Sequence, residues 1–173
     1  MHAPIADLTS AELTSAELVA DPSLTAAILE LNNAHAIELS LLTSEGLVEL
    51  IGVAWRAWCI GRADAMMIAL DQAADYDNPN HRWFRARYDR FVYVDRIVVS
   101  PAARGQGMAR RLYERLIREA TAAGHDRIVC EVNLAPPNPQ SDAFHAALGF
   151  QPLAAASIHG GAKTVRYLAR SLR

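Results

Sequence analysis

The stretch Ile97–Ala123, IVVSPAARGQGMARRLYERLIREATAA, joins an apolar segment to an amphipathic one through a short loop that contains two glycines. The apolar run at Ile97–Val99 is typical of a β-strand, and it stops at Ser100-Pro101. From Met108 onward, apolar residues recur at spacings of three and four, which predicts a helix with one apolar face. Gly124 suits a left-handed helix end. The stretch therefore predicts a strand, a glycine loop and a helix in succession.

The loop between this strand and helix has features of a phosphate-binding site. A helix N-terminus presents unpaired backbone N–H groups and the positive end of the helix dipole, and both attract phosphate. Gly105 and Gly107 would let a phosphate approach the main chain, and Arg104 adds a positive charge. A tight turn without any ligand would use the same glycines. The loop lacks a following Gly-Lys-Ser/Thr and a G-x-G-x-x-G run, which excludes a P-loop and a dinucleotide fingerprint.

A second polar pattern opens a helix near the C-terminal end. Asn138-Pro139 matches an N-cap residue followed by proline at the first helical position, and Gly149 suits the helix end. Asn138, Ser141 and His145 are spaced i, i+3 and i+7, so they share one helix face. That face is either a cap followed by solvent-facing residues or a recognition surface, and both interpretations fit the spacing.

The two patterns together resemble a known family. The loop Arg104–Ala109 (RGQGMA) fits R-x-x-G-x-A after an apolar strand, and so resembles the coenzyme A pyrophosphate loop of the GNAT superfamily of N-acetyltransferases. Asn138 is followed seven positions later by His145, where most members have tyrosine, and then by Leu148-Gly149-Phe150, which resembles the same family. The resemblance covers Phe91–Phe150 and implies an acyl-CoA-dependent enzyme.

The resemblance also implies which residues bind acetyl-CoA, the expected co-substrate. The glycine loop would hold the pyrophosphate, and the polar helix face would hold the pantetheine arm. Main-chain groups of the strand would pair with that arm as with an added strand. The expected set is Ile97, Val98, Val99, Arg104, Gly105, Gln106, Gly107, Met108, Ala109, Asn138, Ser141 and Phe144. No metal ion is expected to take part.

For the fold, the resemblance and the order of segments predict one mixed α/β (α+β) domain over residues 1–173. It has a mostly antiparallel central sheet of about six to seven strands and about four flanking helices. The central strands Phe91–Val99 and Asp126–Asn133 are expected to splay apart. Residues 1–20, with the repeat TSAEL-TSAEL, are expected to be weakly structured, with at most one strand. Further helices are expected after Asp21-Pro22 and Thr43, and further strands at Ala54–Ile60, Ala65–Leu70, Leu153–Ala156 and Thr164–Ala169.

Asp95 and Arg96 interrupt the apolar strand Phe91–Val99. A buried charge without a partner costs several kcal/mol, so this pair requires an explanation. One explanation is that the two side chains form separate salt bridges on the two faces of the sheet. The other is that Asp95 is a carboxylate beside a reacting centre.

The family's chemistry implies direct attack of an amine on the acyl group, which requires a base. Asp95, Glu131 or a water between them is the candidate for that base. His145 lies where the usual tyrosine protonates the departing thiolate. A tyrosine of pKa about 10 stays protonated at neutral pH, whereas a histidine of pKa about 6.5 is mostly neutral. His145 is therefore either the acid or only a contact of the cofactor.

Two polar stretches, Asn32–His35 and Asp71–Arg90, are candidates for binding the acceptor. We expect them to form one pocket opposite the pyrophosphate loop, for a small-molecule amine with or without a carboxylate. The alternative is that the second stretch only covers the edge of the sheet. The fold does not choose between small amines and protein amines. The candidate acceptor-binding residues are Asn33, His35, Asp75 and Tyr76.

The composition excludes several other functions. With 51% hydrophobic residues, 21% charged residues and a net charge of -2, the chain has no field that would attract nucleic acid or membranes. Four arginines at positions 82, 85, 87 and 90 lie among Asp75, Asp77 and Asp89 without a groove-reading motif, which disfavours nucleic-acid binding. Cys59 and Cys130 lie in apolar stretches and are expected to be reduced core residues of a cytoplasmic protein, not catalytic nucleophiles.

Neither a signal peptide nor a membrane span is expected from the pattern of apolar residues. A homodimer is left open. A non-catalytic protein that binds acyl-CoA as a signal and regulates a partner is the alternative to an enzyme, and the histidine at position 145 keeps this alternative open.

Overall fold

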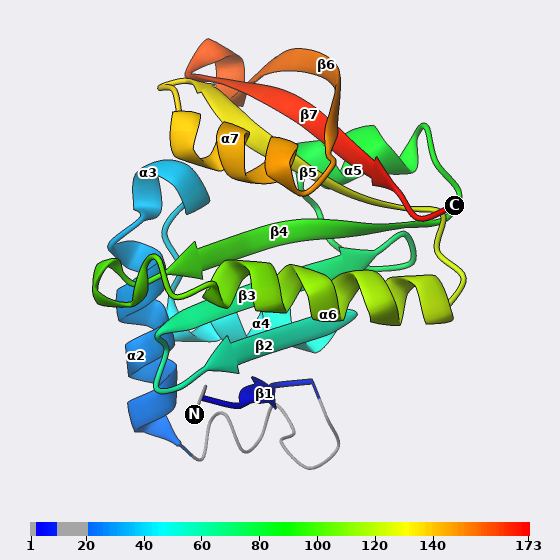
Figure 1. Cartoon of the computed structure of the whole chain (residues 1–173). Coiled ribbons are helices and arrows are strands. Elements are labelled where there is room, and N and C mark those ends of the chain that lie inside the picture. Colours follow the sequence, from blue (N-terminus) through cyan, green and yellow to red (C-terminus); the bar gives the residue numbers. More distant parts are fainter. Residues whose placement is uncertain (1–2, 10–20) are drawn as a thin grey trace.

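The computed structural model describes residues 3–9 and 21–173, and its seven strands form one sheet (Figure 1). The order across the sheet is β1-β2-β3-β4-β5-β7-β6, and every pair is antiparallel except β4 and β5. This confirms the mostly antiparallel sheet. The strands are β1 (Ile5–Asp7), β2 (Arg56–Ile60), β3 (Ala65–Asp71), β4 (Phe91–Val99), β5 (Arg127–Ala135), β6 (Gln151–Ile158) and β7 (Lys163–Ser171).

Six α-helices lie in the described part of the chain, more than the predicted number of about four. The difference comes from two short helices, a single turn at α3 and two turns at α5. Local capping explains most of the helix starts, because Asp21, Thr43, Asn78 and Asn138 each accept a hydrogen bond from the first turn of the helix that follows. The helices are α2 (Pro22–Asn33), α3 (Ala36–Leu39), α4 (Ser44–Val53), α5 (Pro79–Arg85), α6 (Met108–Ala122) and α7 (Pro139–Ala147).

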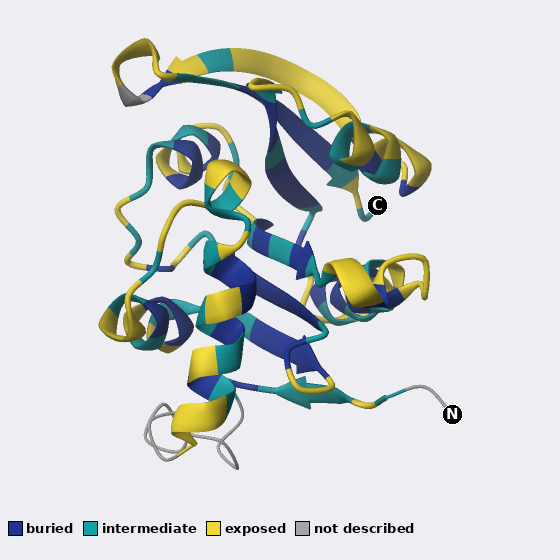
Figure 2. Ribbon diagram, turned by 90° about the vertical axis from the view of Figure 1, so that its left-hand side faces the viewer, coloured by how far each residue is buried: buried dark blue, intermediate teal, exposed yellow. Residues whose placement is uncertain are grey.

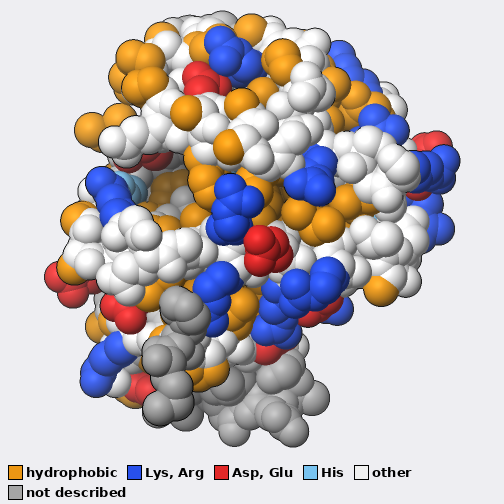
Figure 3. Space-filling view, in the orientation of Figure 1, with side chains coloured by type: hydrophobic (Ala, Val, Ile, Leu, Met, Phe, Trp, Pro, Cys, Tyr) orange, Lys and Arg blue, Asp and Glu red, His pale blue; other side chains and the backbone are white. Residues whose placement is uncertain are grey.

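The helices cover both faces of the sheet, with α6 and α7 on one face and α2, α4 and α5 on the other (Figure 1). Each face has its own apolar core. Leu112 and Leu116 of α6 pack on one, and Ile28, Leu47 and Phe84 pack on the other. Figure 2 shows that burial is concentrated on the inner strands, whereas β6 at the edge is largely exposed. Arginine side chains gather over the outer side of α6 (Figure 3).

The strands β4 and β5 are paired at one end only, which confirms the predicted splay. Phe91–Tyr93 pairs with Arg127–Val129 in parallel, and beyond these three pairs the two strands separate. A β-bulge lies in β4 at the point of separation, because Arg96 faces Ile68 and Val94 faces Ala69, so that Asp95 has no partner on β3.

The bulge corrects one sequence-based expectation. An extra residue in a strand places two successive side chains on the same face, so Asp95 and Arg96 do not form separate salt bridges on opposite faces. Arg96 Nε instead lies 3.1 Å from Asp95 Oδ2, and both side chains are buried. Asn32, Leu39 and Ser40 provide the oxygens that accept hydrogen bonds from the other end of the guanidinium group.

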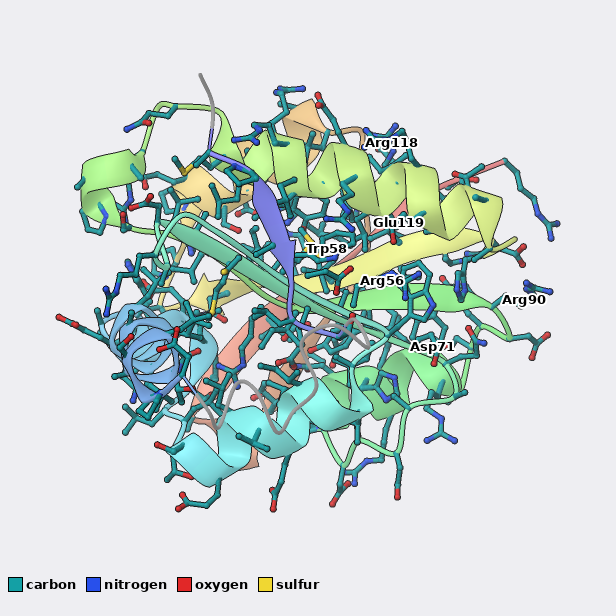
Figure 4. The ribbon with its side chains drawn as sticks, turned by 90° about the horizontal axis from the view of Figure 1, so that it is seen from below. Arg56, Trp58, Asp71, Arg90, Arg118 and Glu119 are labelled. Carbon is teal, nitrogen blue, oxygen red and sulfur yellow. The ribbon has the colours of Figure 1, made fainter. Side chains whose placement is uncertain are left out.

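Part of the N-terminal segment is ordered, since Ile5–Asp7 forms β1 against β2. Residues 10–20, which carry most of the TSAEL repeat, lie outside the described part of the chain. Glu119 of α6 accepts from Arg56 Nε at 2.6 Å and from Arg115 Nε at 2.8 Å, and Arg115 also lies 3.2 Å from Asp7. Figure 4 shows Arg56 and Glu119 next to Trp58, where this network ties the β1–β2 edge to α6.

The two cysteines, Cys59 and Cys130, are free and buried, as the sequence predicts. Among the residues that the structure describes, the longest helices fall short of the length and apolarity needed to cross a bilayer.

Leu116→Ala should destabilise the fold by about 2–5 kcal/mol, because Leu116 is fully buried beneath α6 and its loss leaves a cavity. Arg118→Ala, on the exposed side of the same helix, should change the free energy of unfolding by no more than about 0.5 kcal/mol. Urea denaturation of the two variants and the parent measures both values. Equal midpoints for the two variants would contradict the assignment of α6 to the core.

Candidate active site

A cavity of about 520 Å³ lies along the end of β4 that does not pair with β5, between α3, α7 and the loop before α6. Figure 3 shows a recess on this side of the molecule. The lining includes every residue expected to bind the cofactor except Gln106, which is exposed and whose side chain lies 3.4 Å from the Ala102 carbonyl. The lining set is Ile97, Val98, Val99, Arg104, Gly105, Gly107, Met108, Ala109, Asn138, Ser141 and Phe144.

The loop before α6 presents backbone donors to this cavity. Gly105 and Gly107 have φ of 76° and 73°, a left-handed conformation that favours glycine. Gly107 is the N-cap, and within the described chain α6 has no side-chain cap hydrogen bond. The first backbone bond into the helix is Arg111 N to Gly107 O at 3.0 Å, so the N–H groups before it are available to a ligand. Arg104 adds a positive charge at the rim of the cavity.

His145 lines the cavity but is only 2% exposed, and both its ring nitrogens have partners. Nδ1 lies 2.8 Å from the Ser141 carbonyl oxygen, and Nε2 lies 2.7 Å from the Tyr113 hydroxyl. A carbonyl can only accept, so we assign the proton to Nδ1, and Nε2 then accepts from the hydroxyl. Burial lowers the pKa of His145. The ring is therefore neutral at pH 7 and has no proton on Nε2 to donate.

Asp95 and Glu131 lie on the opposite face of the sheet from His145, outside the lining of the cavity. Asp95 Oδ1 accepts from the Tyr76 hydroxyl at 2.9 Å, and Oδ2 forms the ion pair with Arg96. Glu131 Oε1 accepts from the Tyr93 hydroxyl at 3.0 Å. Burial raises the pKa of both carboxyl groups, and together with the charge of Asp95 it raises the pKa of Glu131 to about 8.

The four residues expected to bind the acceptor are not brought into one pocket. His35 lines the large cavity. Asp75 and Tyr76 line a separate cavity of about 200 Å³ next to α4. The Asn33 side chain holds the backbone of Leu42, accepting from its N–H at 2.9 Å and donating to its carbonyl at 3.0 Å. Asn33 is therefore used to fix the loop between α3 and α4, and only His35 lies beside the expected cofactor site.

Several residues around these carboxylates were not identified from the sequence. Tyr93 lies two positions before Asp95, in a strand predicted to be adjacent to that of Glu131. Residues two positions apart in a strand share a face, so the sequence contained a usable signal for Tyr93. Asn80 and Tyr167 gave no such signal, because they reach the site from α5 and β7. No group of three potential metal ligands is found among the described residues.

Comparison with known proteins agrees with this geometry. Residues 49–150 match the sequence model of the Acetyltransferase (GNAT) family. The chain belongs to the GNAT family. No curated protein matches this GNAT chain in sequence.

Solved structures with the same fold show how far the likeness extends. The ribosomal-protein-S18-alanine N-acetyltransferase from Escherichia coli has 16% identity and a TM-score of 0.65, over 98% of this chain and 93% of that chain. Ard1 from Thermoplasma volcanium has 10% identity and a TM-score of 0.72, over 99% and 98%. yncA from Salmonella typhimurium, solved with acetyl-CoA, has 19% identity and a TM-score of 0.66, over 100% and 95%. At these identities the likeness shows the fold.

Gly107→Ala in this GNAT protein should weaken coenzyme A binding about tenfold, because an alanine at positive φ costs roughly 1–2 kcal/mol and the loop would shift its N–H groups to relieve that strain. Gly160→Ala is the matched control. Gly160 also has a positive φ, 66°, and like Gly107 has nothing within 4 Å of an added Cβ, but it does not line the cavity. Calorimetric titration with coenzyme A measures both, and equal affinities would remove the phosphate-binding role of the loop.

Proposed function

We propose that the chain transfers an acetyl group from acetyl-CoA to the primary amine of a small molecule by direct attack. The observation that carries this proposal is the continuity of one cavity from the glycine loop to the end of β4 that does not pair with β5. Backbone N–H groups at the start of α6 suit the pyrophosphate, and the unpaired side of Ile97–Val99 suits an extended arm. Asn138, Ser141 and Phe144 of α7 form the opposite wall.

Bound acetyl-CoA supplies an activated thioester, and the residues of the chain bind it, exclude water and receive the amine's proton. Glu131 is the proposed base, since a carboxylate must be unprotonated to accept a proton and its raised pKa lies within reach of neutral pH. Direct attack is favoured over an acyl-cysteine because Cys59 and Cys130 are buried and burial raises the pKa of each thiol, which disfavours the nucleophilic thiolate.

For His145 we propose a supporting role, not that of a protonated acid. Its Nδ1–H holds the Ser141 carbonyl, and its ring packs edge-on against Phe144 and Phe150. These contacts fix the part of α7 that faces the cavity. A departing thiolate of pKa about 8.5 persists at moderately alkaline pH without an obligatory proton donor, provided that hydrogen bonds reach it.

A small acceptor is favoured by contacts that narrow the far side of the separation between β4 and β5. Lys163 Nζ of β7 donates to the Glu38 carbonyl at 3.0 Å, and Asn133 Nδ2 of β5 lies 3.5 Å from the Ile37 carbonyl. These contacts tie α3 to β5 and β7, and an opening restricted by them would admit an amine on a small molecule more readily than a folded protein surface.

The proposal is tested by incubating the purified protein with acetyl-CoA and a panel of amines that includes amino acids, polyamines and peptides. Thiol release that requires a small amine supports the proposal. Release only with peptides would replace the small acceptor by a protein amine. Tight binding of coenzyme A without thiol release under any of these conditions would favour the non-catalytic regulatory alternative.

The rate with a reactive amine should rise with pH through about 8, because Glu131 has to lose its own proton before it accepts one from the amine. Asp95→Asn removes the neighbouring negative charge that helps to raise this pKa, so the midpoint of the rise should move to lower pH. Glu131→Gln should lower kcat by roughly 10²–10⁴-fold. Profiles of kcat/KM against pH for the three proteins measure this. An unmoved midpoint in Asp95→Asn would exclude Glu131 as the titrating group.

A further inference from the structure

The side chain of Asn80 lies between two polar groups beneath helix α5. Asn80 is 5% exposed, its Nδ2 donates to Glu131 Oε1 at 2.8 Å, and its Oδ1 accepts from the Tyr167 hydroxyl at 3.0 Å. In its ionised, proton-accepting form the Glu131 carboxylate can only accept, so in that form Glu131 sets the orientation of the amide and Tyr167 holds it. The residue thus connects α5, β5 and β7 at the proposed base.

The two oxygens of Glu131 have different surroundings. Oε1 accepts two hydrogen bonds, from Asn80 and from the Tyr93 hydroxyl at 3.0 Å. Oε2 is buried and has no hydrogen-bond partner among the described residues. Two donors at Oε1 fix the plane of the carboxylate and leave the lone pairs of Oε2 open. A buried polar atom without a partner calls for an explanation, and a proton acceptor awaiting its substrate is such an explanation.

Asp95, the other candidate base, lacks this asymmetry. Oδ1 accepts from Tyr76, and Oδ2 lies 3.1 Å from Arg96 Nε. These two atoms form an ion pair but no hydrogen bond, because the N–H is not directed at the oxygen. Both oxygens of Asp95 therefore face a donor or a cation. Asp95 acts as a fixed negative charge beside Glu131, and the carboxylate with an open oxygen is Glu131.

We propose that Asn80 is a positioning residue that orients Glu131 so that Oε2 receives the proton of the acceptor amine. This inference rests on the proposed acetyl transfer. In that transfer the amine nitrogen forms its bond to the acyl carbon and gives its proton to Oε2, while the electron pair of the breaking carbon–sulfur bond leaves with sulfur. Removing the amide of Asn80 removes a donor that favours the charged carboxylate, so Glu131 should bind its proton more tightly.

Other groups near Glu131 do not obscure this effect. Burial raises the pKa of Tyr93, Tyr113, Tyr167 and Cys130, so these groups stay neutral, and Asp95 and Lys163 are the charges that act on Glu131. From α5, Asn80 contributes an uncharged contact. Helix α5 is also anchored without Asn80, because Phe84 is fully buried and Trp83 stacks on Tyr167 at 4.1 Å between ring centroids.

The test is a carbon-13 NMR titration of the glutamate carboxyl groups in the protein without cofactor, with Glu131→Gln used to assign the signal. In Asn80→Ala the midpoint for Glu131 should move upward by about one pH unit, which corresponds to tenfold tighter binding of its proton. In kinetic assays the same variant should lose roughly tenfold or more in kcat at pH 7, with an unchanged affinity for coenzyme A.

Asn78→Ala is the matched control. Asn78 caps α5 through its side chain but makes no contact with Glu131 in the described structure, so this variant should lower the melting temperature without moving the midpoint. If Asn80→Ala unfolds, Asn80→Asp keeps the shape of the side chain and should move the midpoint upward further.

An unmoved midpoint in a folded Asn80 variant would overturn the proposal, as would a rise in the acceptor KM with unchanged kcat, which would make Asn80 a substrate contact. Because the titration needs no substrate, its result stands apart from the acetyl-transfer assay. An upward shift in a protein that acetylates no amine would overturn the proposed function and leave the effect of Asn80 on Glu131 in place.

Discussion

The incomplete pairing of β4 with β5 is the constraint on which the rest of the structure depends. The strands are nine residues long each and pair over three residues, after which β4 keeps its partner β3 and β5 keeps its partner β7. Backbone groups on the facing sides of the two strands are left for a ligand, since a buried backbone donor or acceptor requires a partner. The glycine loop, α7 and α3 are placed around this opening.

The bulge at Asp95 connects this opening to the helices on the other face. By turning Asp95 and Arg96 to the same face, it creates a buried ion pair, and such a pair is stable only when further hydrogen bonds satisfy both groups. Arg96 Nη1 donates to Asn32 Oδ1 and to the Leu39 and Ser40 carbonyls, so the position of the turn after α3 depends on the arginine that the bulge turns to this face. The wall of the proposed acceptor side is thus set by the irregularity in the sheet.

The sequence predicted best those features that depend on residues close together in the chain. Caps such as Asp21 and Asn138, and the glycines before α6, act on residues three or four positions away, so their patterns predicted helix starts and the loop. The bulge was missed because β4 is apolar on both faces. A one-residue shift in register therefore exchanges one apolar residue for another and leaves no mark in the sequence pattern. The contact of Asn80 with Glu131 joins residues 51 positions apart, and local spacing carries no information on it.

The two faces of the sheet divide the polar groups by charge, and this bears on the order of proton movements in the proposed reaction. On the α6–α7 face, His145 is neutral because burial lowers its pKa, and Tyr113 is neutral because burial raises its pKa. On the other face lie Asp95, Glu131 and Lys163, whose charges interact. In the proposed reaction a proton taken from the amine would therefore stay on the face of the sheet that carries Glu131, away from His145. On the cofactor side His145 has no proton on Nε2 to donate, so in the proposed reaction the thiolate would leave without a proton from the residue that replaces the family's tyrosine.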